Sequence, residues 1–334
     1  MLGIRRRTGL GVVGSLVWLA AKPAWAVAQS FDAWLVDLRR EALAKGIDAR
    51  TLDAAFAGVR PIPSVLEADR RQPEGRMTFE EYRQRVVNAA RIDRGRELLA
   101  EHGQLLRRIE AKYGVPAEIM VALWGIESNY GERQGSYSVF AALATLAYDG
   151  RRAKFFRREL LSALEIANRG YIDAERMQGS WAGAMGQNQF MPSTYLGYAV
   201  DFDRDGHRDI WGALPDVLAS MANYLAKSGW DSRYLWGRQV SVPPGLDAAR
   251  TGLEHKAPLA TWQERGVRLP DGDRLPEVRI PASLLLLGRD DSASFLVYGN
   301  FRALMAWNRS TYFGVSVGLL SDSLRDGRGS SSML

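Results

Sequence analysis

Apolar positions along the chain recur mainly at helical spacing, which predicts a protein built chiefly from α-helices. The first such pattern covers residues 31–56, with a break at 46–48. Residues 61–77 carry three prolines and predict an extended connection. A long pattern over 78–113, rich in Arg and Glu, indicates a helix with a solvated charged face. Together these segments predict an N-terminal helical layer over residues 29–115.

A more apolar stretch, PAEIMVALWGIESNYG, occupies residues 116–131. Its leading proline and closing glycine are helix start and stop signals, and apolar side chains around nearly the whole circumference predict a buried helix. Met120, Leu123 and Glu127 share one face, so the carboxyl of Glu127 lies on an apolar stripe. Desolvation and the negative helix C-terminus should raise its pKa and prepare it to act as a general acid. Alternatively, Glu127 turns out to solvent from a fraying helix end.

Two further helices are predicted over 140–148 and 151–167, the second with a cluster of arginines on its wet side. That basic side is interpreted as a solvated face, with contact to an anionic polymer as the alternative. The following stretch, GSWAGAMGQNQFMPSTY over 179–195, interleaves glycines with aromatic and amide side chains. This composition favours a tight backbone wall of a sugar-binding site. A Gly-rich packing turn is the competing interpretation.

Residues 201–209 read DFDRDGHRD and resemble the beginning of a calcium-binding loop. Gly206 stands where the sharp turn is needed. The bidentate Glu expected twelve residues into such a loop is absent, since Gly212 stands there, so we expect the next carboxylate to close a longer loop. The site predicted is a structural one, with an ordinary acidic turn as the alternative. The candidate ligands are Asp201, Asp203, Asp205, His207 through its carbonyl oxygen, Asp209 and Asp216.

The pattern of apolar and polar positions changes after residue 235. Short β-branched runs separated by Pro, Gly and Asp predict a small β-containing insertion over 236–290. The helical pattern of 116–235 predicts a core that resumes as a helical region over 291–322, and 323–334 is predicted to be a disordered tail.

The N-terminal 28 residues have the layout of a secretory signal. Arg5, Arg6 and Arg7 precede an apolar run over 9–21, and small-residue cleavage patterns follow at 24–28. Since the run is short for a membrane span, we expect export and cleavage, with an uncleaved anchor as the alternative. Without this segment the formal charge falls from +6 to +2, so a nucleic-acid partner is not expected.

The remaining composition narrows the chemistry. The 334 residues are 46% hydrophobic, enough for one large domain or two smaller ones with a core. The chain has no cysteine, which excludes a thiol nucleophile, a Cys-based metal site and a lipid-anchored N-terminal cysteine. With only three histidines, a His-rich zinc site is not expected either, and no organic cofactor is predicted.

Five motifs in one order carry a family resemblance: GIESNYG, ATLAYDGRR, GSWAGAMGQNQFMPSTY, the DxDxDG loop and NFRALMAWNRSTYF. Together they resemble the membrane-bound lytic murein transglycosylase B family over about residues 30–322. The resemblance implies a mainly α (α+β) fold, with a lysozyme-like core, a surrounding helical layer and a small β-containing insertion. It also implies a structural calcium ion in the acidic loop.

The resemblance implies that Glu127 is the sole catalytic acid and base. Such an enzyme cleaves the β-1,4 bond between N-acetylmuramic acid and N-acetylglucosamine and leaves a 1,6-anhydromuramic end. Trp307 stands where the family pattern leads us to expect a tyrosine. The expected setting is a soluble periplasmic monomer, not a lipoprotein, acting on peptidoglycan glycan strands. The candidate substrate-binding residues are Ser180, Met185, Gln189, Tyr195, Asn308 and Tyr312.

Two other functions stay open at this point. Ordinary glycosidases use two carboxylates, and neither GIESNYG nor GSWAGAMGQNQF offers a second one beside Glu127. A distant carboxylate would permit a muramidase that hydrolyses the same polymer. The other alternative is a peptidoglycan-binding scaffold without turnover.

Overall fold

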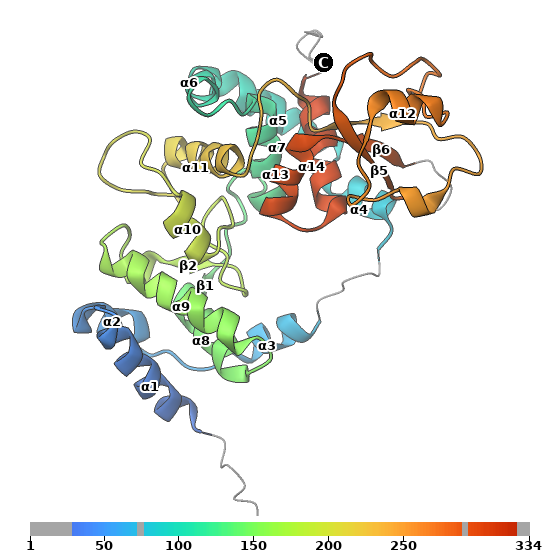
Figure 1. The fold of residues 1–334 in the computed structure, drawn as a ribbon. Helices are drawn as coiled ribbons and strands as arrows, with labels where there is room; N and C mark the ends of the chain where they lie inside the picture. Colours follow the sequence, from blue (N-terminus) through green and yellow to red (C-terminus); the bar gives the residue numbers. More distant parts are fainter. Residues whose placement is uncertain (1–28, 72–76, 289–292, 326–334) are drawn as a thin grey trace, which may run out of the picture.

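Fourteen α-helices and six short strands make up residues 29–71, 77–288 and 293–325, which are the residues described in the computed structural model (Figure 1). The mainly helical character predicted from apolar spacing is confirmed. The predicted signal at 1–28 lies outside the described residues. Within the described ranges, no helix combines the length and apolar character needed to cross a membrane.

The N-terminal layer has more helix breaks than the sequence pattern predicted. Its first helices are α1 (Phe31–Ala44) and α2 (Ala49–Phe56), followed by α3 (Pro63–Arg70). The extended connection predicted over 61–77 is therefore wrong where α3 lies. A proline at the first helical position needs no hydrogen-bond partner for its nitrogen, so Pro63 starts this helix rather than preventing it.

The single helix predicted over 78–113 is wrong, because three helices occupy it: α4 (Phe79–Val86), α5 (Ala89–Glu101) and α6 (Gly103–Tyr113). The side chain of Asn88 accepts a hydrogen bond from the backbone N–H of Arg91 and caps the start of α5. His102 separates α5 from α6 with a non-helical backbone. Caps of this kind leave the 3.6-residue apolar period intact, so periodicity alone does not reveal them.

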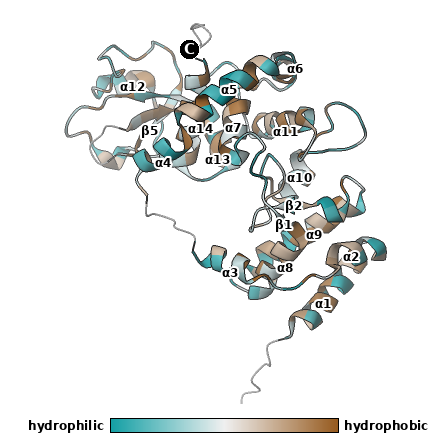
Figure 2. Ribbon diagram, turned by 180° about the vertical axis from the view of Figure 1, so that it is seen from behind, coloured by the Kyte–Doolittle hydropathy of each residue, from teal (hydrophilic) through white to brown (hydrophobic). Residues whose placement is uncertain are grey.

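The central helix α7 (Ala117–Ser128) lies in the upper half of the molecule, and nine of its twelve residues are buried (Figure 1). It packs against α5, α6, α11 (Leu214–Lys227) and α14 (Thr311–Arg325), while α13 (Gly299–Trp307) joins the same apolar core. In Figure 2, α7 is drawn mostly in the hydrophobic colour, whereas α4 carries much of the hydrophilic colour. Non-local packing thus fixes α7 from several sides.

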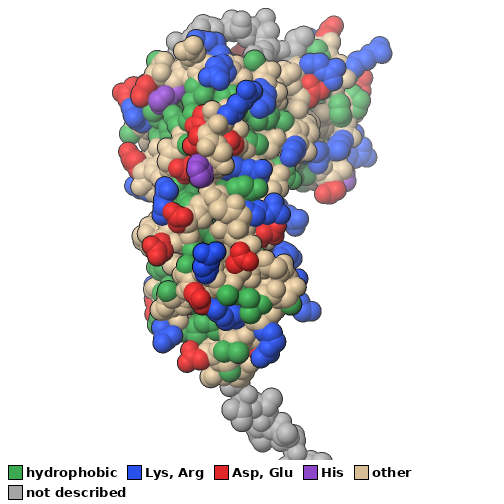
Figure 3. Space-filling model, turned by 90° about the vertical axis from the view of Figure 1, so that its left-hand side faces the viewer, with side chains coloured by type: hydrophobic (Ala, Val, Ile, Leu, Met, Phe, Trp, Pro, Cys, Tyr) green, Lys and Arg blue, Asp and Glu red, His purple; other side chains and the backbone are tan. Residues whose placement is uncertain are grey.

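A second core surrounds α8 (Val139–Asp149) and α9 (Ala153–Asn168), with α1, α2, α3 and α10 (Pro192–Tyr198) packed on them. Arg151 and Arg152 donate to the carboxylate of Asp69, a buried residue of α3, and Arg157 pairs with Glu41 of α1. These arginines of the basic segment therefore bind protein carboxylates. On the face drawn in Figure 3, basic and acidic side chains are intermixed over the surface.

A two-stranded sheet, β1 (Tyr137–Ser138) and β2 (Gln178–Gly179), lies between these two helical groups (Figure 1). Its register pairs Tyr137 with Gly179. The loop before β1 approaches β2 so closely that a Cβ on Gly135 would lie 2.1 Å from the carbonyl oxygen of Gly179. Only glycine fits at that position.

The β-containing insertion holds an antiparallel four-stranded sheet in the order β3-β6-β5-β4. Its elements are β3 (Gly237–Val240), β4 (Ala257–Pro258), α12 (Leu259–Glu264), β5 (Pro281–Leu286) and β6 (Ser294–Val297). Strand β6 begins after the predicted end of the insertion at 290. All four of its residues are buried, so it lacks the alternation that identifies a half-buried strand. The predicted tail is helical as far as Arg325, and 326–334 lie outside the described residues.

Candidate active site

Glu127 is the last but one residue of α7, and the chain turns sharply after it. Asn129 and Tyr130 follow with φ angles of 51° and 61°, in the left-handed region. The Tyr130 hydroxyl donates to the carbonyl of Arg91 at 2.7 Å, and its ring passes so close to Gly125 that a Cβ there would lie 2.7 Å from it. This packing fixes the end of α7 and with it the backbone position of Glu127.

Glu127 is half-buried, and its carboxyl has one hydrogen-bond partner in the described part of the chain. The indole Nε1–H of Trp307 donates to its Oε1 at 2.6 Å. Burial raises the pKa of Glu127 to about 7, while the hydrogen bond from Trp307 lowers that pKa and so partly opposes the rise. The direction predicted from the sequence is the one found. Near neutrality the group can therefore both give and take a proton.

No second carboxylate within the described ranges contributes to this pKa shift. Glu132, the nearest acid in the sequence, is exposed and accepts from the side chain of Asn129 at 2.5 Å. Glu127 therefore stands alone as a titratable acid at the end of α7.

Aromatic rings from four elements gather beside this carboxyl. Trp307, at the end of α13, packs against Phe190 and Tyr224, with ring centroids 5.1 and 4.9 Å away. Tyr82 of α4 contributes a phenol whose pKa is raised by burial and then by the negative charge of Glu127. The ring of Tyr82 lies 6.1 Å from that of Tyr312. Flat apolar faces of this kind suit sugar rings.

Four of the predicted substrate-binding residues have accessible side chains. Ser180 and Gln189 are half-buried; Ser180 Oγ accepts from the N–H of Ala184, and the Gln189 amide donates to the carbonyls of Gln134 and Gly186. The donors of Gln189 are therefore committed, and its carbonyl oxygen is left to accept.

The other two accessible candidates flank the end of α13. Asn308 directly follows Trp307, is exposed, and accepts from the N–H of Ser310. Tyr312 is half-buried and stacks edge-on against Phe79 with ring centroids 5.4 Å apart. Asn308 follows the residue that binds Glu127, and Tyr312 contacts Tyr82, whose pKa responds to the charge of Glu127.

Met185 and Tyr195 are corrections, because both side chains are fully buried in the second core and expose no surface to a substrate. The Tyr195 hydroxyl donates to the carbonyl of Arg208 at 2.8 Å. The Gly-rich stretch has no regular period of apolar positions, so its sequence does not predict which side chains point into the core and which stay accessible.

The amide cluster expected to face sugars is also mostly structural. Gln187 is buried; it accepts from the indole of Trp124 and donates to the carbonyl of Trp211. Asn188 is buried and donates to the carbonyl of Val217. Both amides satisfy groups inside the wall that would otherwise lack a partner. Of the three amides in the stretch, only Gln189 remains accessible.

The acidic loop brings three of its predicted ligands together. Carboxylate oxygens of Asp201, Asp203 and Asp205 lie within 4.8 Å of one another. Oxygens on opposite sides of a calcium ion are about 5 Å apart, so this group fits the ion. Asp216 is buried and accepts from the N–H groups of Phe202 and Asp209, which ties the two ends of the loop together.

Asp209 and His207 lie outside this close group. Oδ1 of Asp209 accepts from the N–H groups of Trp211 and Gly212 and shapes the chain after the loop. The N–H of His207 donates to the carboxylate of Asp205. The side chains of Asp201, Asp203 and Asp205 are thus the natural first ligands of a cation.

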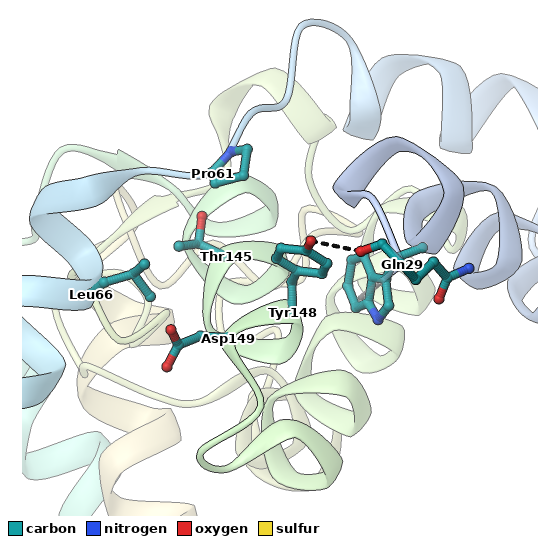
Figure 4. A pocket seen from close by; sticks show the side chains of 7 residues that line it. Gln29, Pro61, Leu66, Thr145, Tyr148 and Asp149 are labelled. Atoms are coloured by element: carbon teal, nitrogen blue, oxygen red, sulfur yellow. Dashed lines mark hydrogen bonds between the residues drawn. The ribbon is translucent and has the colours of Figure 1, made fainter. Parts of the chain in front are cut away.

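A separate hollow of about 460 Å³ lies between α1, α3 and α8 and contains none of the predicted site residues (Figure 4). Its polar groups already have partners. Tyr148 donates to the carbonyl of Gln29, Thr145 bonds to Ile62 and Ala141, and Asp149 pairs with Arg70. This hollow is therefore part of the packing of the N-terminal layer.

Sequence reasoning missed the parts played by Trp307 and Tyr82. Trp307 stood out only as a tryptophan in place of a tyrosine, and its contact with Glu127 spans 180 positions. Tyr82 lies in the 78–113 segment, of which the sequence analysis interpreted only the charged side chains. Its spacing of three from the buried Phe79 places the two on one helical face, and this signal was available.

Comparison with known proteins shows the family to which the chain belongs. The profile of the transglycosylase SLT domain matches residues 30–322. The membrane-bound lytic murein transglycosylase B of Escherichia coli (strain K12) is 33% identical over 255 residues, or 71% of this chain. The match spans 64% of that relative, which is less than two thirds of its length.

Solved structures share the fold as well. SltB3 from Pseudomonas aeruginosa, in complex with NAG-anhNAM-pentapeptide, superposes with a TM-score of 0.87 at 47% identity, over 92% of this chain and 82% of that one. The Escherichia coli lytic transglycosylase Slt35, in complex with calcium, gives a TM-score of 0.75 at 30% identity, over 88% and 93% of the two chains. The predicted lysozyme-like fold is confirmed by these similarities.

Proposed function

Because the chain belongs to the transglycosylase SLT domain family, we propose that it is a lytic transglycosylase of peptidoglycan. It cleaves the β-1,4 bond between N-acetylmuramic acid and N-acetylglucosamine and leaves a 1,6-anhydromuramic end. The observation that carries this proposal is the lone carboxyl of Glu127, half-buried, with a pKa of about 7 and no second carboxylate contributing to the shift. One carboxyl can serve as both acid and base when the nucleophile is a hydroxyl of the substrate instead of water.

In the first step, protonated Glu127 gives its proton to the glycosidic oxygen as the bond to the anomeric carbon breaks. The acetamido oxygen of the substrate stabilises the positive charge that develops at this carbon. In the second step, the Glu127 carboxylate removes the proton of the muramyl 6-hydroxyl, whose oxygen forms the new bond to the anomeric carbon. The proton lost in the first step is thereby regained.

The accessible side chains around Glu127 supply the binding contacts in this proposal. We assign hydrogen bonds with sugar hydroxyl and acetamido groups to Ser180, the carbonyl oxygen of Gln189 and Asn308, because these side chains are accessible. Tyr312 and Tyr82 offer aromatic faces to sugar rings. The partner is the peptidoglycan glycan strand.

The product of digestion tests the reaction. Purified protein incubated with peptidoglycan sacculi should release muropeptides that end in anhydromuramic acid. Mass spectrometry identifies them, because each lacks one water relative to a reducing-end product. Reducing ends alone would instead identify a muramidase, and no release of soluble fragments would identify a binding scaffold.

We also propose that the loop of Asp201, Asp203 and Asp205 holds a structural calcium ion. The grouped carboxylates support it, as does the calcium in the similar Slt35. A ligand that binds only the folded state stabilises it, by about 2.7 kcal/mol at a concentration one hundred times its Kd. The melting temperature should therefore be several degrees higher in calcium than in chelator.

The matched control for calcium is Asp203→Asn, which removes one ligand charge and leaves the turn. In this variant the difference between calcium and chelator should shrink or vanish. An equal melting temperature of the unaltered protein in calcium and in chelator would make the loop an ordinary acidic turn.

The proposed substrate also indicates in which cellular compartment the protein acts. Peptidoglycan lies outside the cytoplasmic membrane, and the arginines and apolar run of residues 5–21 supply the pattern for export. We therefore place the protein in the periplasm, where it acts as a monomer on glycan strands.

A further inference from the structure

We propose that Trp307 is a positioning residue that fixes which oxygen of Glu127 carries the catalytic proton. This inference rests on the proposed function and deepens it. Trp307 donates to Oε1 of Glu127 at 2.6 Å, and an indole N–H can donate but has no lone pair with which to accept. The oxygen it contacts must therefore always be an acceptor.

This restriction assigns the proton to Oε2. The carbonyl oxygen of a protonated carboxyl accepts more strongly than its hydroxyl oxygen, so the indole N–H on Oε1 favours the hydrogen on the other oxygen. Among the described residues no hydrogen bond to Oε2 is found, and Oε2 is not one of the buried atoms without a partner. Oε2 is therefore the oxygen that remains open to substrate.

The surroundings of Trp307 keep the indole in place. Its ring packs against Phe190 and Tyr224, whose rings also contact each other with centroids 6.0 Å apart, so the three rings form one cluster. The hydroxyl of Tyr224 donates to the carbonyl of Ala306 at 2.6 Å and ties α11 to the end of α13. Turning the indole away from Glu127 would therefore break its contacts with both rings.

The same hydrogen bond acts in both steps of the reaction. While Glu127 is protonated, Oε1 accepts as a neutral carbonyl oxygen. When the proton leaves Oε2 for the glycosidic oxygen, Oε1 becomes part of a carboxylate and the bond from Trp307 becomes charge-assisted and stronger. An interaction that strengthens as the bond breaks lowers the barrier. The indole keeps its own proton throughout.

A tyrosine at this position would behave differently. Its hydroxyl can donate to a carboxylate, but it can also accept from a protonated carboxyl, so either oxygen of Glu127 could carry the proton. The replacement of the expected tyrosine by Trp307 therefore makes the proton position unique in this chain.

Nuclear magnetic resonance tests the proposal without requiring activity. In protein labelled with ¹⁵N-tryptophan and ¹³C-glutamate, the Nε1–H signal of Trp307 should move as pH changes, with the same midpoint as the carboxyl carbon of Glu127. In Glu127→Gln this movement should be absent. An indole signal that ignores the ionisation of Glu127 would overturn the proposal.

Substitution separates the hydrogen bond from ring packing. Trp307→Phe keeps an aromatic ring without a donor and should raise the midpoint of Glu127 by about one pH unit, a tenfold change in its ionisation equilibrium. The alkaline limb of kcat/KM should move by the same amount, and kcat should fall about tenfold. Trp307→Tyr restores a donor and should return the midpoint toward its original value.

The outcomes distinguish the two proposals. If the midpoint of Glu127 is the same in the unaltered protein and in Trp307→Phe, and only KM changes, Trp307 is merely a platform for sugars and the inference fails. If the midpoint shifts as expected but digestion yields no anhydro product from the unaltered protein, the proposed function fails while the inference about the proton stands.

Discussion

Replacing Glu127 with glutamine should lower the release of soluble muropeptides by at least ~10³-fold. The amide has nearly the shape of the carboxyl and can still accept from Trp307. It cannot give a proton to the glycosidic oxygen or take one from the 6-hydroxyl, so both steps are lost. Binding of a glycan fragment, measured by calorimetry, should change only a few-fold.

Glu132→Gln is the matched control. It alters an exposed carboxylate five positions away, beyond the end of α7, and should leave turnover close to that of the unaltered protein. Equal turnover in Glu127→Gln and the unaltered protein would contradict the proposed role of Glu127. Equal loss in both variants would point to disruption of the turn after α7.

The stability of Glu127→Gln provides a check on folding. The folded-state pKa of Glu127 is about 7 and its usual value is 4.5, so the carboxyl stabilises the fold fully below pH 4.5 and this contribution is lost as pH rises through 7. Glutamine does not ionise. The variant should therefore melt at the same temperature or higher than the unaltered protein at pH 8, with the advantage diminishing toward pH 4.

Gly135→Ala should destabilise the protein by about 2–5 kcal/mol and lower its activity as well. The φ angle of Gly135 is +87°, where a side chain costs about 1–2 kcal/mol. A Cβ would also lie 2.1 Å from the carbonyl oxygen of Gly179 and 2.5 Å from the nitrogen of Ser180, and overpacking adds about 1–3 kcal/mol. Both neighbours are backbone atoms, so relief requires the wall that carries Ser180 to move.

Gly150→Ala separates the cost of the backbone conformation from the cost of overpacking. Gly150 has a similar φ angle of +93°, but nothing lies within 4 Å of the position of its Cβ. It should cost only the backbone penalty of about 1–2 kcal/mol and leave digestion of sacculi unchanged. Denaturant unfolding and a turnover assay on both variants measure the difference. If Gly135→Ala is no more harmful than Gly150→Ala, the close approach of the loop to β2 is not essential.

Local sequence patterns were sufficient for the features that depend on neighbours along the chain. The apolar circumference of 116–131 predicted a buried helix, and the position of Glu127 on it predicted the direction of its pKa shift. The spacing of Asp201, Asp203 and Asp205 predicted their grouping. In each case the groups concerned lie within a few turns of one helix or one loop, so spacing fixes their geometry.

The tertiary structure decided which side chains are buried or accessible and which residues far apart in the sequence come into contact. Met185 and Tyr195 are buried, although they belong to the same stretch as the accessible Ser180, because the folding of that wall determines which side each residue faces. The sequence by itself determined that an acid stands near the end of a buried helix, with no second carboxylate in the neighbouring motifs. Only the packing of α13 against α11 and α14 brought Trp307 to it, since a hydrogen bond across 180 positions leaves no periodic trace in the chain.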